Sequence, residues 1–262
     1  MNFRWPMPFI RRLFCALFVG YATIVVAQDA PQIAAASDLK FALDEIAANY
    51  STETGAKVRI AYGSSGNFRL QIAQGAPFQL FLSADESFVF ALTKEGRTLD
   101  EGALYAIGRI VLFAPHGSIL KAGEGMKALG EALSKGAVQK FAIANPDHAP
   151  YGRAAREALT QAGLWTAIQP RLVLGENVSQ AAQFASSSGI QGGIFAYSLA
   201  LSPSVTQLGS YSLIPESMHQ PLKQRMALMK NASPQAKAFY QYLQRPAARV
   251  IFKRFGFTLP GE

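Results

Sequence analysis

The sequence predicts an α/β protein of two lobes, because short apolar strands alternate with helical runs along most of its length. Half of the 262 residues are hydrophobic and 16% are charged, which is enough apolar material for one large core or two modest ones. No repeat and no low-complexity linker interrupts the alternation. The number of strands favours two lobes, each a sheet flanked by helices, over a single sheet.

Runs of β-branched or aromatic residues mark the expected strands, and apolar residues at helical spacing mark the expected helices. One helix, Leu39–Tyr50, would carry Leu39, Leu43, Ile46, Ala47 and Tyr50 on one face. The predicted strands are Ile33–Ala36, Val58–Tyr62, Gln79–Ser83, Arg109–Ala114, Lys140–Ala144, Arg171–Leu174 and Gly193–Tyr197. The other predicted helices are Phe68–Ala73, Gly152–Gln161, Ser179–Ala185 and a C-terminal pair broken at Pro246.

Two segments are expected to carry the chain between the lobes, one near Gly108 and one near Gly209–Leu213. This places residues 28–108 and 213–262 in lobe 1 and residues 109–212 in lobe 2.

The first residues resemble a secretory signal peptide, which we expect to span residues 1–27. Arg4, Arg11 and Arg12 precede the apolar run LFCALFVGYATIVVA, which ends in the small residue Ala27. A membrane anchor is the alternative, but the run is shorter than the roughly twenty residues that a span needs. We therefore expect export to a periplasm, with cleavage of the peptide.

Charge and composition exclude several functions. Without the three arginines of the signal peptide, 22 basic residues remain against 17 acidic ones, so the net charge is +5. The basic residues are scattered, which argues against a nucleic-acid partner. The single cysteine, Cys15, lies in the signal peptide, and the three histidines have no close ligand partners, so neither a thiol nucleophile nor a metal centre is expected.

Four strand-to-helix junctions carry small, hydroxylic or amide residues: Ala36–Asp38, Ser64–Gly66, Pro150–Gly152 and Glu176–Ser179. Helix N-termini at the carboxyl ends of strands are ligand sites in open α/β sheets, and their unpaired N–H groups suit an oxyanion. Each junction alone is also an ordinary helix cap. A carboxylate facing an anion would repel it, so we expect Asp38 to offer its N–H and to turn its side chain away.

Four blocks together resemble the periplasmic molybdate-binding proteins of ABC importers: AAASDLKFALDEIA, YGSSGNFRLQIAQGAPFQLFLSAD, NPDHAPYGRAAREALTQAGLW and AFYQYLQRPAARVIFKRFGF. The resemblance implies the two-lobed periplasmic-binding-protein fold of type II, with a tetrahedral dianion in the inter-lobe cleft. It assigns hydroxyl and N–H contacts to Ser37 and Ser65, and main-chain N–H contacts to Asp38, Tyr151 and Val178. The anion would be bound through its oxygens, without direct bonds from protein to metal.

The chain departs from this family's pattern in places. Gly66 stands where many members continue a serine run, and Gln79 stands where many have an acidic residue. Some members use a tyrosine hydroxyl near Tyr197, but here the register is shifted by one residue, so we do not assign it a contact.

The sequence therefore predicts a monomeric receptor that captures molybdate, and also tungstate, without a cofactor and delivers it to an ABC permease. One alternative is a receptor of the same fold for sulfate, phosphate or a small carboxylate. A buried arginine or lysine in contact with the ligand would favour the carboxylate. Another is an exported hydrolase that uses Ser65. For this role the sequence shows no evident His/Asp pair beside Ser64 or Ser65.

Overall fold

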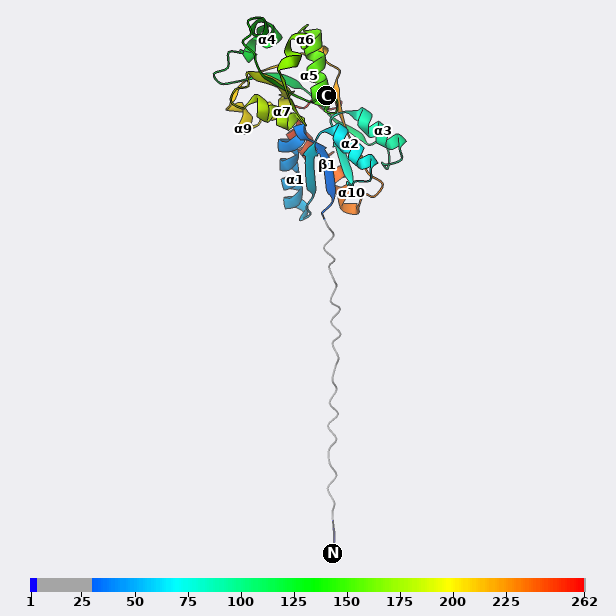
Figure 1. Cartoon of the computed structure of the whole chain (residues 1–262). Coiled ribbons are helices and arrows are strands. Elements are labelled where there is room, and N and C mark those ends of the chain that lie inside the picture. Colours follow the sequence, from blue (N-terminus) through cyan, green and yellow to red (C-terminus); the bar gives the residue numbers. More distant parts are fainter. Residues whose placement is uncertain (4–29, 262) are drawn as a thin grey trace.

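The protein folds into two five-stranded sheets flanked by helices, as Figure 1 shows. The structure is a computed structural model that describes residues 1–3 and 30–261. Beyond residue 3, the signal peptide expected over residues 1–27 lies outside the described part of the chain. Within that part, no helix has the length and apolar character needed to cross a membrane. The predicted two-lobed α/β fold is confirmed.

The first sheet has the strand order β2-β1-β3-β10-β4. Strands β2, β1 and β3 are parallel, whereas β10 runs antiparallel to both of its neighbours. The strands are β1 (Gln32–Ala36), β2 (Arg59–Gly63), β3 (Leu80–Ser83), β4 (Ala103–Gly108) and β10 (Leu222–Leu228).

The second sheet has the order β7-β6-β8-β5-β9. Strand β6 is parallel to β7 and β8, and β5 is antiparallel to β8 and β9. The strands are β5 (Ile110–Pro115), β6 (Phe141–Ala144), β7 (Leu172–Gly175), β8 (Gly192–Ala196) and β9 (Gly209–Leu213).

The chain passes between the sheets twice. Only Arg109 separates β4 from β5, and residues 214–221 join β9 to β10. The exact bounds of the two lobes stay a prediction.

Three strands were missed in the sequence: β4, β9 and β10. Each of them pairs antiparallel with its neighbours. Strand β9 (GSYSL) is only half-buried, and β10 carries Lys223, Gln224 and Arg225 in its interior, so these two segments have a weak apolar pattern. Strand β4 (ALYAIG) is almost wholly apolar, so the prediction overlooked a signal that its sequence contains.

The helices divide between the sheets, and we name the resulting bodies the first and second lobes (Figure 1). The C-terminal pair is interrupted at Pro246, as predicted, because proline starts the last helix. The first lobe holds the 3-10 turn η1 (Ser37–Leu39) and helices α1 (Lys40–Thr54), α2 (Ser65–Ala73), α3 (Glu86–Lys94), α10 (Pro234–Tyr242) and α11 (Pro246–Arg254). The second lobe holds α4 (Gly125–Ser134), α5 (Pro150–Gln161), α6 (Trp165–Ile168), α7 (Val178–Ala185), α8 (Tyr197–Ala200) and α9 (Pro203–Thr206), with η2 (Ala122–Glu124) and η3 (Gln169–Arg171). The turn η4 (Glu216–Met218) lies on the segment that joins β9 to β10.

Strand β1 is buried on both faces, as strands in the middle of a parallel sheet are. Ile33 and Ala35 belong to the apolar cluster that includes α1, whereas Ala34 packs with Phe68 and Phe81 in a second cluster. Each large apolar side chain buried in this way stabilises the fold by about 1.5–3 kcal/mol. The sheet is thus well packed on both faces. The residues that follow its strands, such as Ser37 after β1 and Ser64 after β2, lie at the candidate site.

Candidate functional site

A small cavity lies between the two lobes, where strands of both sheets end. Its volume is about 10 Å³, close to the minimum that a single water molecule needs. The lobes therefore lie close together around a space no larger than one small group. The cavity is lined by Ala36, Ser37, Asp38, Gly63, Ser64, Ser65, Ala84, Ala149, Pro150, Tyr151 and Val178.

The structure brings all five predicted site residues together at this cavity: Ser37, Asp38, Ser65, Tyr151 and Val178. Their individual roles toward a ligand remain predictions. A wider groove of about 360 Å³ contains Ser179 but none of the five predicted residues, and it is lined largely by apolar side chains such as Phe41 and Leu199.

Three helices direct their N-terminal ends at the cavity. Ser65 and Val178 are the first residues of α2 and α7, and Tyr151 follows Pro150, which has no N–H, at the start of α5. N–H groups in a first helical turn have no intrahelical acceptor. Within the described residues, none of these three N–H groups donates to another atom. They are available to a guest, and each helix end adds about half a positive charge.

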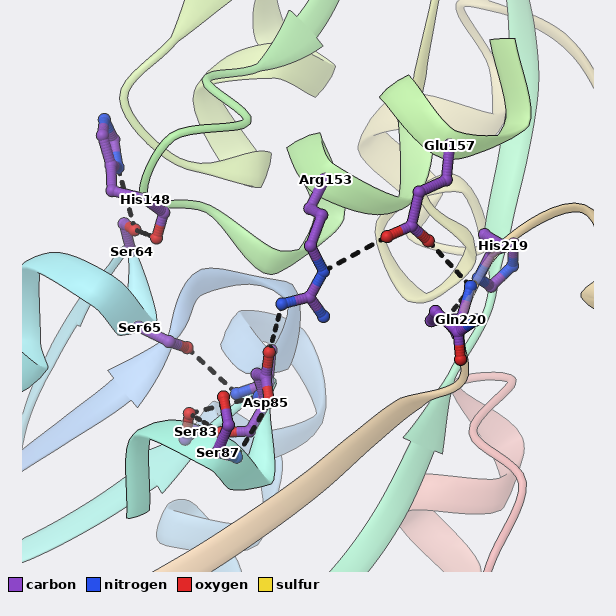
Figure 2. Close-up of polar contacts among 11 residues, drawn as sticks. Ser64, Ser65, Ser83, Asp85, Ser87, His148, Arg153, Glu157, His219 and Gln220 are labelled. Atoms are coloured by element: carbon purple, nitrogen blue, oxygen red, sulfur yellow. Dashed lines mark hydrogen bonds and ion pairs between the residues drawn. The ribbon is translucent and has the colours of Figure 1, made fainter. Parts of the chain in front are cut away.

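The hydroxyl of Ser65 is oriented by the backbone. Its Oγ accepts a hydrogen bond from the N–H of Ala84 at 3.0 Å, as Figure 2 shows. Because that bond uses the oxygen as an acceptor, the hydroxyl hydrogen remains to be donated. Ser65 is also almost fully buried, so a guest in the cavity is the natural acceptor.

The hydroxyl of Ser37 is engaged differently. It donates to Asn177 Oδ1 at 3.0 Å and accepts from the N–H of Ser179 at 3.2 Å, while Ser179 Oγ donates to the Ser37 carbonyl at 2.8 Å. These bonds tie η1 of the first lobe to the start of α7 in the second. In this arrangement the Ser37 hydroxyl serves the contact between the lobes, and its hydroxyl and N–H contacts to a ligand stay predictions.

Ser64, His148 and Glu176 form a second contact between the lobes (Figure 2 shows the first two). The Ser64 hydroxyl donates to the His148 carbonyl at 2.6 Å, and His148 Nδ1 lies 3.0 Å from the same Oγ. His148 Nε2 is 3.5 Å from Glu176 Oε2. No local pattern in the sequence predicts this Ser–His–Glu arrangement, because the three residues lie far apart along the chain. The single hydroxyl hydrogen is already bound to the carbonyl, so the ring does not activate Ser64 as a nucleophile.

Gly66 packs against the same His148 carbonyl so closely that a side chain would not fit at this position. Its N–H donates to the His148 carbonyl at 3.1 Å, and a Cβ at this position would lie 2.5 Å from that oxygen. A serine would not fit here without movement of the backbone. The departure from a longer serine run therefore has a steric reason.

Asp38 is the centre of a buried polar network that joins the lobes. Its Oδ2 accepts from Tyr151 Oη at 2.8 Å and from Gln224 Nε2 at 2.7 Å, and Tyr105 donates to Gln224 Oε1 at 2.8 Å. Burial raises the pKa of Asp38 to about 6, although the hydrogen bonds from Gln224 and Tyr151 act in the opposite direction. Ser198 of α8 also donates to the Asp38 carbonyl at 2.8 Å.

Gln224 and Tyr105 were not predicted from the sequence, although the pattern around Gln224 indicates a buried polar side chain. In LKQRMAL, Gln224 shares the inward face of β10 with Leu222 and Met226, and a polar residue at such a position needs a partner. A break in the pairing register between Gln224 and Arg225 helps to aim the side chain. Ser198, one residue after Tyr197, makes the contact near the cavity, whereas Tyr197 does not line it.

No lysine or arginine lines the cavity in the part of the chain that the structure describes. The basic residues that follow the junctions are bound to carboxylates: Lys40 to Asp44, Arg69 to Glu95, and Arg153 to Asp85 across the lobes (Figure 2 shows the last). Burial acts to raise the pKa of Asp85, but the hydrogen bond and charge of Arg153 outweigh it, so that pKa is lowered. The described residues also contain no cluster of three or more His, Cys, Asp or Glu side chains that could hold a metal ion.

Two α/β lobes that enclose a small cavity lined with N–H and hydroxyl donors are the architecture of a two-lobed solute-binding protein. Within this class, the chain belongs to the family of bacterial extracellular solute-binding proteins, which matches residues 31–258.

Two relatives named molybdate-binding protein ModA share much of the sequence. The one from Rhodobacter capsulatus is 35% identical over 82% of this chain and 82% of its own length. The one from Azotobacter vinelandii is 32% identical over 95% of this chain and 98% of its own.

Two solved structures of solute-binding proteins have the same fold as this chain. The Azotobacter vinelandii periplasmic molybdate-binding protein superposes with a TM-score of 0.79 at 29% identity, covering 88% of this chain and 99% of that one. The sulfate-binding protein SubI of Mycobacterium tuberculosis shares the fold with a TM-score of 0.70 at 14% identity, covering 88% of this chain and 87% of that one.

Proposed function

We propose that this protein captures molybdate, and also tungstate, and delivers it to an ABC permease. The observation that carries the proposal is the small cavity between the lobes, where three helix N-termini and the Ser65 hydroxyl supply neutral donors and where none of the described residues that line it is cationic. Such donors stabilise an oxyanion through partial charges. The relatives named molybdate-binding protein support molybdate as the anion.

Capture would proceed by closure of the lobes, without chemical change to the ligand. Ser65 and Asp38 belong to the first lobe, whereas Tyr151 and Val178 belong to the second. An anion that contacts both sides favours the closed form, which the permease can then recognise. Among the described residues, Ser65 Oγ accepts from the Ala84 N–H and has no general base bonded to it, and the Ser64 hydroxyl is bound to a carbonyl, so the geometry does not favour the hydrolase alternative.

Export also belongs to the proposal. The family is described as extracellular, and the N-terminal sequence has the pattern of a cleaved signal peptide, so we place the mature protein in the periplasm as a monomer. Its partners would be the anion and the permease, and no nucleic acid.

A receptor for hydrogen phosphate is the second candidate, and a specific observation favours it. Asp38 lines the cavity, and its Oδ1 is a buried acceptor without a donor among the described residues. A protonated oxyanion needs such an acceptor for its hydrogen. A small carboxylate is less well served, since neither Arg69 nor Arg153 lines the cavity.

The test is a thermal-shift panel of molybdate, tungstate, sulfate and phosphate on the mature chain. A ligand present at one hundred times its dissociation constant should stabilise the fold by about 2.7 kcal/mol. Ser65→Ala should reduce the shift, whereas Ser134→Ala, at an exposed position of α4, should leave it unchanged. A shift with phosphate alone would replace the first candidate by the second.

A further inference from the structure

Asp38 is an acidic group in a site built for an anion. It lines the cavity and is 1% exposed. Oδ2 has two donors, Tyr151 and Gln224, whereas Oδ1 is buried and has no hydrogen-bond partner among the described residues. Within the same residues Asp38 forms no ion pair, so nothing but neutral groups offsets its charge.

An ionised Asp38 and a doubly negative guest are incompatible in so small a space. Two like charges that share a buried site raise the pKa of the weaker acid strongly, because both cannot remain ionised. None of the described residues that line the cavity carries a positive charge to screen them. Either the anion is repelled, or Asp38 becomes neutral when the anion enters.

We propose that Asp38 makes the site bind its oxyanion together with one proton, and so selects the protonation state of the ligand. The inference rests on the proposed function, in which the guest is an oxyanion. The proton comes from solvent and forms an O–H bond at Oδ1 of the carboxylate, leaving a neutral carboxyl group. Oδ2 continues to accept from Tyr151 and Gln224.

Among Asp38 and the side chains that surround it, only the Asp38 carboxylate can take up the proton. The titratable side chains that face it are Tyr151 from α5 and Tyr105 from β4, and their pKa values are raised well above the ordinary value by burial and by the charge of Asp38. Both tyrosines are therefore neutral throughout the physiological range. Gln224 from β10 and Ser198 from α8 do not titrate. Burial raises the pKa of Asp38 itself to about 6, so even the ligand-free site is partly protonated in mildly acidic solution.

A fully deprotonated oxyanion such as molybdate must recruit its proton through Asp38, so its affinity should fall as solvent protons become scarce. Hydrogen phosphate is doubly negative as well, so an ionised Asp38 repels it too.

Isothermal titration calorimetry of the mature wild-type chain with sodium molybdate tests the inference. Above pH of about 6 the association constant should fall about tenfold per pH unit, with about one proton taken up per anion. Titrations in buffers that differ in ionisation enthalpy measure that proton directly. Asp38→Asn keeps a carbonyl acceptor for Tyr151 and Gln224 and supplies a neutral donor, so its affinity should be independent of pH and should exceed that of the wild type in alkaline solution.

Asp44→Asn is the matched control. It removes one negative charge from the same region, on the exposed side of α1, and should keep the wild-type pH dependence. Molybdate binding by the wild type that is independent of pH and takes up no proton would overturn the inference while leaving the proposed function intact. Absence of binding to any oxyanion would instead overturn the proposed function. Should Asp38→Asn fail to give a cooperative unfolding transition, the buffer series on the wild type decides alone.

Discussion

Replacing Gly108 with alanine should weaken anion binding by preventing full closure of the lobes. Gly108 ends β4 at the first crossing between the sheets, and it is buried. A Cβ here would lie 2.2 Å from Tyr151 Oη and 2.9 Å from Gln224 Nε2. Because carbon atoms do not approach an oxygen so closely, the Tyr151 hydroxyl must move away from Asp38.

The magnitude follows from the bonds that are lost. Tyr151 Oη donates to Asp38 Oδ2 at 2.8 Å and accepts from Gln224 Nε2 at 2.9 Å. A buried hydrogen bond contributes about 1 kcal/mol, so the closed form should lose about 2 kcal/mol. The clash with Tyr151 exists only when the second lobe lies against the first, because Gln224 belongs to the same sheet as Gly108, so the loss of the Tyr151 bonds falls on the closed form alone. The anion affinity should therefore drop about 30-fold.

Calorimetric titration with molybdate measures this change. Gly123→Ala is the matched control, because no atom lies within 4 Å of the Cβ that it would add. In a Tyr151→Phe background, Gly108→Ala should cost less than in the wild type, since the hydroxyl that it displaces is gone. Unchanged affinity of Gly108→Ala, or strict additivity in the double variant, would refute the steric explanation.

Three further predictions concern the same region. Burial raises the pKa of Asp38 from 3.8 to about 6, so between these pH values the folded protein binds more protons than the unfolded chain and stability falls as pH rises. Asp38→Asn should therefore stabilise the ligand-free protein by about 3 kcal/mol above pH of about 6 and should have no effect below pH 3.8. Urea unfolding at one pH on each side of this range measures the difference, and equal stabilisation at the two pH values would contradict the prediction. Arg153→Met removes the partly exposed ion pair that Arg153 forms with Asp85 across the lobes. It should weaken anion binding by about 1 kcal/mol, and this loss should shrink as salt is added. A loss that does not depend on salt would argue against an electrostatic role of the pair. Gly66→Ser introduces a Cβ that would lie 2.5 Å from the His148 carbonyl, so it should lower the anion affinity despite adding a hydroxyl, and tighter binding in calorimetry would disprove the steric account.

Much of the fold was readable in the sequence because it depends on local patterns. All seven predicted strands are present within one or two residues of their expected bounds. The face predicted for the first helix is also right: Leu39, Leu43, Ile46 and Tyr50 are buried, and Ala47 is half-buried. Apolar spacing reports which side of an element meets the core, and that information is carried by neighbouring residues.

The candidate site was predicted less completely. Small residues at helix starts led to Ser37, Asp38, Ser65, Tyr151 and Val178, because caps and N-terminal donors have a local signature. The contacts that join the lobes have none. Ser37 meets Asn177 and Ser64 meets His148 across long stretches of chain, so no sequence pattern links the members of either pair.

The sequence by itself determined the alternation of strands and helices and the donors at the ends of the helices, because each follows from residues a few positions apart. The tertiary structure alone decided what surrounds Asp38. Gln224, 186 positions away, and Tyr151, 113 positions away, reach its carboxylate only after both sheets have formed and the lobes have met. The charge state of a buried acid depends on the water it has lost and on the groups that replace that water, and these are supplied by the folded molecule.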